Sequence, residues 1–234
     1  MERLDKLLAA TGQWSRKEAK ALVKAGRVQV GGARPKGPED KVAEGTPVTV
    51  DGRPIATEQG VYVMLHKPAG VVSSTQDPRE RTVLDLLPQH LRRRALFPVG
   101  RLDKDTEGLL LLTNDGDLAH RILSPRHGVW KRYYAEHEGR TGPEDVRAFE
   151  QGLVLADGLH CLPARLTPLS DGRSIVCVQE GKYHQVRRML ASRGCPVTYL
   201  RREAEGGLTL GSLPLGQTKE LDIVEAEGLL QNIL

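Results

Sequence analysis

The chain has 234 residues, of which 39% are apolar and 27% are charged, a balance typical of a globular protein rather than a disordered or fibrous one. No stretch approaches the roughly 20 consecutive apolar residues of a membrane-spanning helix, and the N-terminus does not read as a signal peptide. Cys161, Cys177 and Cys195 are odd in number and far apart, which indicates neither a disulfide framework nor a CxxC metal site and predicts a reducing, cytoplasmic location.

The net charge is only +4, but it is unevenly distributed. Residues 1–36 contain nine Lys and Arg and only three Asp and Glu, a net charge of +6, so the rest of the chain sums to about −2. A basic block in front of a nearly neutral body suggests a module that binds a polyanion, joined to a second module.

The basic block predicts two helices followed by two short strands. Apolar residues at positions 4, 7 and 8 share one helical face, and Gly12 is expected to end this first helix. Ser15 and Glu18 form a capping box that starts the second helix. Strands are expected at 27–30 and 46–50. Basic side chains on these helices could bind phosphates, in which case binding would weaken with salt, or could simply hydrate the surface.

Three segments in this block resemble the alpha-L motif, a small RNA-binding module of a ribosomal small-subunit protein and of several rRNA-modifying enzymes. They are Arg3-Leu-Asp-Lys, Ser15-Arg-Lys-Glu-Ala and Lys24-Ala-Gly-Arg-Val-Gln-Val-Gly-Gly. The resemblance implies that the helices bind structured RNA, through Arg3, Arg16, Lys17 and Lys20. We expect this domain to span 1–52, followed by a polar linker at 53–60.

The remaining residues, 61–234, predict more strands than helices, without regular alternation. Strands are expected at 61–65, 96–99, 109–112, 129–135, 164–166, 174–178, 197–200 and 208–210. Helices are expected at 82–87, 117–123, 144–151, 185–192 and 225–230, with breaks at Pro88 and Pro125. This order favours an α+β domain with a mixed, mainly antiparallel sheet. GxGxxG, GxxxxGK[ST] and HExxH patterns do not occur, so no cofactor or metal is implied.

The most informative stretch is residues 100–116, Gly-Arg-Leu-Asp-Lys-Asp-Thr-Glu-Gly-Leu-Leu-Leu-Leu-Thr-Asn-Asp-Gly. Four leucines between Gly108 and Thr113 predict a buried strand, so the charged segment before them is a loop that leads into the sheet. Loops held by a rigid scaffold often carry reacting side chains. From the residues alone, Asp103 and Asp105 are equivalent, and both could belong to an ordinary surface turn.

Aromatic and basic residues elsewhere complement these aspartates. Tyr133 and Tyr134 follow Lys131, and the segments 180–190 and 200–202 supply Arg and Lys. A carboxylate, a flat ring and guanidinium groups are what is required to extrude an RNA base, stack it and act on it. Plainer roles are open as well, because a tyrosine at 133 could pack between strands and an arginine at 187 could pair with a surface acid.

Together these segments resemble the rRNA pseudouridine synthases of the RsuA/RluB type. The stretch 100–116 carries the resemblance, and Met64-Leu-His-Lys-Pro-Ala-Gly, Ser124-Pro-Arg-His and Lys182-Tyr-His-Gln-Val-Arg-Arg-Met follow the family's order. The resemblance implies a pseudouridine synthase catalytic domain over 61–234 that isomerises a uridine of rRNA without a cofactor. These segments look closer to the small-subunit branch, which implies 16S rRNA, and 23S rRNA is the alternative.

The resemblance also assigns roles by position. Asp103, the first aspartate after Arg-Leu, falls where the family has its nucleophile, and an ionised carboxylate can hold an electron-deficient sugar or add to the base. Arg187 falls where the family has a basic partner, which would keep this carboxylate ionised. Tyr133 would stack on the target uracil, Leu200 would line the pocket, and Arg101 would enter the gap left by the flipped nucleotide.

Some features and alternatives remain beside this assignment. Tyr134 and His66 depart from the family's usual residues, and Asp105 is left to support the loop. The partner is expected to be rRNA or an assembly intermediate, with no membrane, and the protein to be a monomer. A non-catalytic rRNA-binding or ribosome-assembly protein is a second class. A glycosidase that uses Asp103 and Asp105 is disfavoured because both carboxylates lie on one loop rather than flanking a bond.

Overall fold

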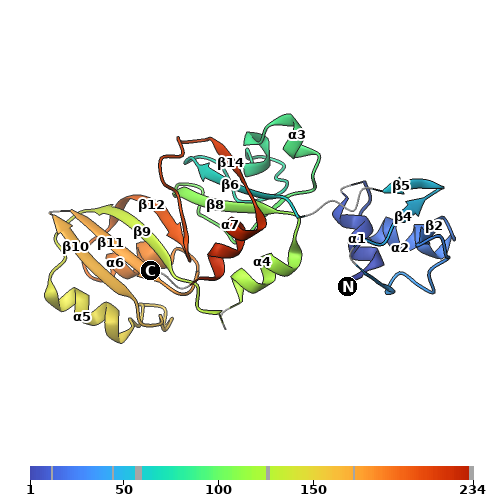
Figure 1. The fold of residues 1–234 in the computed structure, drawn as a ribbon. Helices are drawn as coiled ribbons and strands as arrows, with labels where there is room; N and C mark the ends of the chain where they lie inside the picture. The colour runs from blue at the N-terminus through green and yellow to red at the C-terminus, as the bar shows by residue number, and fades with distance from the viewer. Residues whose placement is uncertain (12, 44, 56–59, 125–126, 171, 232–234) are drawn as a thin grey trace. The chain divides into compact units, whose positions relative to one another are not determined.

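The computed structural model describes residues 1–11, 13–43, 45–55, 60–124, 127–170 and 172–231 (Figure 1). The chain divides into two compact units. One contains Met1–Val61 and Pro88–Leu96, and the other contains Tyr62–Leu87 and Phe97–Leu234. Within the described residues, no helix combines the length and the apolar composition required to cross a membrane.

The N-terminal unit is two helices packed on short strands. In chain order its elements up to residue 61 are β1 (Glu2–Arg3), α1 (Leu4–Ala10), α2 (Arg16–Lys24), β2 (Val28–Val30), β3 (Lys41–Val42), β4 (Val48–Val50) and β5 (Arg53–Ile55). Leu4, Leu8, Ala19, Leu22 and Val23 from the helices join valines of the strands in one core. The predicted capping box is confirmed, since the Glu18 amide donates to Ser15 Oγ at 3.3 Å and the Ser15 amide to Glu18 Oε2 at 2.7 Å. The expected stop at Gly12 lies outside the described residues.

The N-terminal sheet corrects the expected domain boundary. β2, β4 and β5 form a three-stranded antiparallel sheet, in which Val50 pairs with Arg53 and Val48 with Ile55. Asp51 and Gly52 have φ values of 51° and 74° and make the tight hairpin that an Asp-Gly pair favours. Residues 53–55 therefore belong to this unit and not to a linker, while 56–59 lie outside the described residues.

The second unit is built on a sheet of nine strands in the described part of the chain, ordered β10-β11-β9-β12-β8-β6-β14, with β13 on β12 and β7 on β8. The strands are β6 (Tyr62–Lys67), β7 (Phe97–Pro98), β8 (Glu107–Thr113), β9 (Lys131–His137), β10 (Arg165–Ser170), β11 (Arg173–Val178), β12 (Val197–Glu205), β13 (Leu208–Thr209) and β14 (Thr218–Leu221). Strands β12 and β8 run parallel, whereas the other described pairs are antiparallel. The α+β class with a mixed, mainly antiparallel sheet is confirmed.

The helices of the second unit cover this sheet. They are α4 (Gly116–Leu123), α5 (Pro143–Gln151), α6 (Gln185–Ala191) and α7 (Ile223–Glu227), with 3-10 turns at Val83–Leu86 and Gly228–Leu230. Figure 1 shows α4 and α7 beside β8. One core joins Leu118 and Ile122 of α4 and Ala226 of α7 to Leu109 and Leu111 of β8. All four leucines of β8 are fully buried, which holds the loop before this strand against a rigid base.

Other expectations also differ from the structure. The helix expected at 82–87 is a 3-10 turn, because Asp85 caps it by accepting from the Thr82 amide at 2.7 Å and Pro88 follows at once. A short helix, α3 (Gln89–Arg92), begins directly after Pro88, which therefore precedes a helix as well as ending a turn. Strand β14 was not predicted, since its sequence Thr-Lys-Glu-Leu carries little apolar signal at the edge of the sheet. The expected break at Pro125 lies outside the described residues.

Candidate active site

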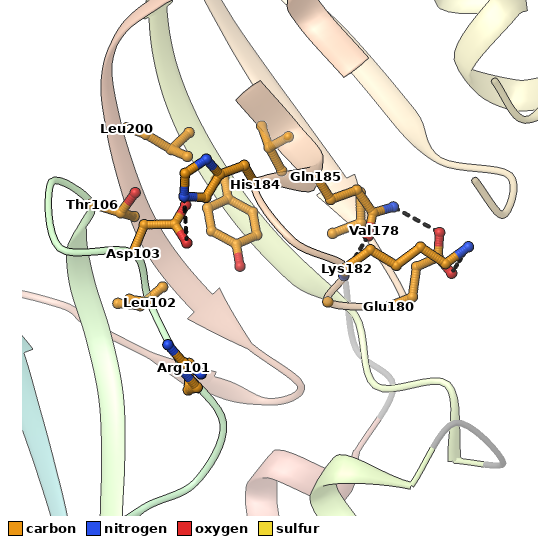
Figure 2. Close-up of a pocket in the computed structure, with 13 residues that line it drawn as sticks. Arg101, Leu102, Asp103, Thr106, Val178, Glu180, Lys182, His184, Gln185 and Leu200 are labelled. Atoms are coloured by element: carbon orange, nitrogen blue, oxygen red, sulfur yellow. Dashed lines mark hydrogen bonds and ion pairs between the residues drawn. The ribbon is translucent and has the colours of Figure 1, made fainter. Parts of the chain in front are cut away.

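A pocket opens where the loop before β8 faces β9, β12 and the segment before α6. Its lining contains Arg101, Leu102, Asp103 and Thr106 from the loop, Tyr133 from β9, Val178 from β11, Leu200 from β12, and Glu180, Gly181, Lys182, His184, Gln185 and Val186 from the opposite wall. Figure 2 shows this arrangement, with Asp103 and His184 turned toward each other. Four of the five residues predicted from the catalytic-domain sequence thus line one pocket.

The loop that carries Asp103 is anchored from below by Lys67, the last residue of β6. This side chain is fully buried, and its Nζ donates to the carbonyl oxygens of Pro68 (3.0 Å), Asp103 (3.0 Å), Lys104 (3.2 Å) and Thr106 (2.8 Å). Burial lowers the pKa of Lys67 to about 8, against the opposing effect of nearby carboxylates. One buried cation therefore ties the end of β6 to the backbone of Asp103 and of the loop residues that follow it.

Two further contacts complete the support of the loop. Ser73 Oγ donates to the Leu102 carbonyl at 2.9 Å and accepts from the Leu102 amide at 3.1 Å. Gly108, at φ +115°, lies where β8 passes β12, and a Cβ there would come within 2.2 Å of the Arg202 carbonyl oxygen. Only glycine allows this close pairing, which sets where β8 begins and the loop ends.

The Asp103 carboxylate is partly exposed and lies beside the imidazole of His184. His184 Nε2 lies 3.5 Å from Asp103 Oδ1, and the dashed line in Figure 2 marks this contact. The Asp103 side chain is 29% exposed and that of His184 is 38% exposed, so the carboxylate remains accessible to a substrate. His184 has left-handed backbone angles (φ 49°, ψ 33°) at the start of α6, which is uncommon for a residue other than glycine.

Arg187 contacts the same loop at a different point. Its Nη2 pairs with Asp105 Oδ2 at 3.0 Å and also lies 3.3 Å from the Asp105 carbonyl and 3.4 Å from Thr106 Oγ1. The expectation that Arg187 neutralises Asp103 directly is therefore corrected. The guanidinium reaches two residues further along the loop because Arg187 lies one helical turn after His184, whose ring occupies the position beside Asp103.

Strand alternation separates the two tyrosines of β9. Successive side chains point to opposite faces of a sheet, and Tyr133, 8% exposed, lines the pocket. Tyr134 instead packs edge-on against Tyr199 at 6.3 Å, under the Arg201 guanidinium at 5.4 Å. Leu200 of β12 pairs with Ala135, two residues after Tyr133 and on the same face, and its buried side chain forms an apolar wall of the pocket that Tyr133 also lines.

Beneath Tyr133 lies a buried charge network. Arg202 and Glu205 are 2% and 1% exposed and pair at 3.2 Å, Lys131 approaches Glu205 at 3.6 Å, and Arg202 Nε donates to the Leu109 carbonyl at 2.8 Å. Burial raises the pKa of Tyr133, although the Arg202 charge acts in the opposite direction. The ring therefore stays a neutral phenol near pH 7, suited to stacking on a base.

The wall opposite the loop is held by side chains of its own segment. Glu180 accepts from Gln185 Nε2 at 2.8 Å and from the Leu162 amide at 2.9 Å, and pairs with Lys182 Nζ at 2.9 Å. Arg101 is an exposed cation at the other end of the pocket (Figure 2). The pocket thus combines an accessible carboxylate, a neutral ring with an apolar neighbour, and cations at its edge, which suits covalent chemistry on a flat, uncharged base carried by a polyanion.

Two of the four N-terminal cations, Arg3 of β1 and Lys20 of α2, lie beside a buried acid. Asp5 is 1% exposed and accepts from Arg3 through Nε (3.0 Å) and Nη2 (2.9 Å), and Lys20 Nζ lies 3.8 Å away. These hydrogen bonds hold the pKa of Asp5 below its ordinary value. Arg16 and Lys17 are exposed on the first turn of α2.

Lys67 and His184 are the site residues that sequence reasoning missed. Both stood within the quoted segments but received no role. A lysine that ends a mainly apolar strand such as Tyr-Val-Met-Leu-His-Lys is a signal of a buried cation, because a charge at such a position requires partners. The contact of His184 had no such signal, since it depends on a left-handed turn that ordinary residues seldom adopt.

Comparisons with known proteins place this geometry in a family. Residues 61–192 match the RNA pseudouridylate synthase family, and residues 2–48 match the S4 domain. The chain is 44% identical to the uncharacterized RNA pseudouridine synthase YtzG of Bacillus subtilis (94% of each chain covered). It is 37% identical to the ribosomal large subunit pseudouridine synthase B of Bacillus subtilis (98% of this chain, 96% of that one). It is 39% identical to the ribosomal small subunit pseudouridine synthase A of Vibrio cholerae (89% and 90%).

The likeness extends to a solved structure. A crystal structure of a pseudouridylate synthase superposes with a TM-score of 0.70 at 32% identity, covering 98% of this chain and all of the other. The comparisons thus confirm a pseudouridine synthase catalytic domain preceded by an RNA-binding S4 domain. The alternative of a non-catalytic rRNA-binding or ribosome-assembly protein is therefore wrong. The chain belongs to the RNA pseudouridylate synthase family, of the RsuA/RluB type with an S4 domain, and is a pseudouridine synthase, an isomerase.

Proposed function

We propose that this enzyme isomerises one uridine of small-subunit (16S) rRNA in the cytoplasm, acting as a monomer on free rRNA or on an assembly intermediate. The observation that supports the reaction most strongly is the meeting of Asp103, Arg101, Tyr133 and Leu200 in one pocket. The C1′–N1 bond of the uridine breaks, the uracil turns within the pocket, and a C1′–C5 bond forms while the C5 proton is lost and N1 gains one. Asp103 supplies the carboxylate, either at C1′ or on the base.

The other residues have positioning roles in this proposal. Tyr133 stacks on the uracil from within the pocket, and Leu200 closes its apolar side. Arg101 occupies the gap that the flipped nucleotide leaves in the RNA. Arg187 acts on Asp103 through the loop, by holding the Asp105 and Thr106 positions. The S4 domain binds RNA, and we assign its contacts to Arg3, Arg16, Lys17 and Lys20.

The choice of 16S rRNA rests on local sequence, with 23S rRNA as the alternative. The segments that begin at Lys67, Ser124 and Lys182 resemble the small-subunit branch, whereas overall identity does not discriminate: it is 39% to a small-subunit enzyme and 37% to a large-subunit enzyme. Treating 16S and 23S transcripts separately with the enzyme and mapping pseudouridine in each decides between them. Modification of 23S rRNA alone would contradict the 16S proposal.

The catalytic proposal is tested by Asp103→Asn. We expect pseudouridine formation to fall by more than about 10³-fold, while RNA binding changes by less than about threefold, because the amide keeps the shape and loses the nucleophile. Asp105→Asn is the matched control, since Asp105 lies two residues away with a side chain 67% exposed, and its loss should be under about tenfold. Equal losses in both variants would show that Asp103 has no special role.

A further inference from the structure

Two aromatic rings are stacked at the rim of the pocket. The rings of Tyr183 and His184 have centroids 3.9 Å apart and planes inclined by only 16°. Tyr183 is 76% exposed, in a chain with only two Phe, two Trp and five Tyr. An exposed aromatic ring gains little from folding, so a fixed ring beside a catalytic pocket is a surface available to a ligand.

The stack runs outward from the catalytic carboxylate. His184 is the inner ring, with its Nε2 3.5 Å from Asp103 Oδ1, and it faces Asp103 in Figure 2. Lys182 and Gly181 line the same wall of the pocket, whereas Tyr183 lies outside the lining and presents its ring to solvent. The pocket wall therefore continues as a flat platform on its outer side.

The backbone holds this platform in place before any ligand binds. The Gln185 amide donates to the Lys182 carbonyl at 3.1 Å, the Lys182 amide to Gln185 Oε1 at 3.0 Å, and the Arg188 amide to the His184 carbonyl at 2.9 Å. These bonds keep His184 in its left-handed conformation, which persists only where the surroundings determine it. A preorganised ring loses little conformational freedom on binding.

RNA at this site supplies a matching partner. When one uridine leaves the stack, its neighbour loses a stacking partner, and an aromatic side chain can replace that partner for any of the four bases. We propose that Tyr183, backed by His184, is a stacking site for the base of the nucleotide next to the target uridine. This inference rests on the proposed function, because it needs an RNA in which that uridine is flipped into the pocket.

The test compares Tyr183→Ala with the parent enzyme on the rRNA transcript that the parent modifies. We expect KM and the RNA Kd to rise by about 5- to 150-fold, the range of base–aromatic stacking, with kcat changed by less than about threefold. Tyr183→Phe and Tyr183→Trp keep a ring and should recover most of the loss. Leu169→Ala, at a residue 52% exposed on β10, is the control for removal of an exposed side chain.

A second arm removes the base instead of the ring. Two RNA fragments are used, with an abasic nucleotide on the 5′ or on the 3′ side of the target uridine. We expect only one of them to bind the parent enzyme more weakly than the intact fragment does. On that fragment, Tyr183→Ala should bind with the same affinity as the parent, because the base that stacks on the ring is already absent. Losses that add independently, or a Tyr183→Ala enzyme with the parent's KM and Kd, would overturn the stacking site. A parent enzyme that forms no pseudouridine in either rRNA would refute the proposed function, and the stacking site would fail with it. A parent enzyme that does form pseudouridine, with a Tyr183→Ala variant of unchanged KM and Kd, would overturn the stacking site alone.

Discussion

In each unit of the chain a buried charged side chain holds candidate functional residues, Lys67 in the catalytic unit and Asp5 in the N-terminal unit, and these two charges have opposite sign. In the catalytic unit, Lys67 is 0% exposed and donates to four backbone carbonyls of its own strand end and the Asp103 loop. In the N-terminal unit, Asp5 is 1% exposed and accepts from Arg3, with Lys20 nearby. One charge binds backbone, whereas the other binds long side chains.

This difference corresponds to what each surface does. Covalent chemistry tolerates small errors in position poorly, and a cation that ties down the backbone of Asp103 and of the residues after it keeps the carboxylate still. Phosphate binding instead requires cations that are oriented but able to adapt, and a buried carboxylate can direct Arg3 without immobilising its exposed side chain. We therefore expect damage to Lys67 to affect catalysis strongly and damage to Asp5 to affect binding mildly.

Lys67→Met gives the largest expected effect. The thioether fills similar space but leaves four carbonyls without their donor, so we expect the catalytic unit to lose about 2 to 4 kcal/mol of stability, measured by urea unfolding. Displacement of the loop should also lower kcat by at least about 10²-fold, measured at a urea concentration below the unfolding midpoint, where the variant is still folded. Lys104→Met is the matched control, since its ammonium is half exposed and pairs with Glu80 at 2.7 Å, and it should cost far less. Similar losses in the two variants would contradict the anchoring role.

A basic limb in the pH profile is the next expected effect. Because the pKa of Lys67 is lowered to about 8, this group loses its proton as pH rises through that value, and a neutral amine has too few N–H groups for its carbonyl partners. We expect kcat to fall between about pH 7.5 and 9, measured in single-turnover assays. Burial raises the pKa of Tyr133, so its ionisation lies above this range. A kcat that stays constant to pH 9 would show that Lys67 keeps its proton.

The sequence predicted the elements that carry strong local signals. Leu109–Leu112 indicated a buried strand, Ser15 and Glu18 indicated the start of a helix, and the charged residues before the leucines indicated a loop, which lines the pocket. Burial and capping depend on short sequence patterns, so they can be predicted locally. The strand at 53–55 could also have been predicted. Asp51-Gly52 favours a hairpin turn that leads into a further strand, but this pair was interpreted only as the end of the strand before it.

The contacts of the site were less predictable. Which side chain lies beside Asp103 depends on the left-handed turn at His184 and on the register of α6, neither of which a linear pattern encodes. Arg187 lies three positions after His184, about one helical turn, and this offset places His184 beside Asp103 and Arg187 beside Asp105. The buried pair of Arg202 and Glu205 was equally hidden. Leu200-Arg-Arg looks like exposed basic sequence until strand alternation buries Arg202, and Glu205, three residues on, can meet it because the register of β12 shifts between Arg202 and Ala204.

The smallest expected effect concerns the N-terminal unit and separates orientation from net charge. Asp5→Asn raises the net charge by one, so simple electrostatics predicts tighter RNA binding. If Asp5 orients Arg3 and Lys20, affinity should instead fall by about two- to fivefold, the size of one surface ion contact, in filter binding to the rRNA substrate. Glu39→Gln is the matched control, because this exposed acid also reaches Arg3, at 3.5 Å, and its loss adds the same charge. If both variants tightened binding equally, the buried carboxylate would contribute charge alone, and the parallel with Lys67 would fail.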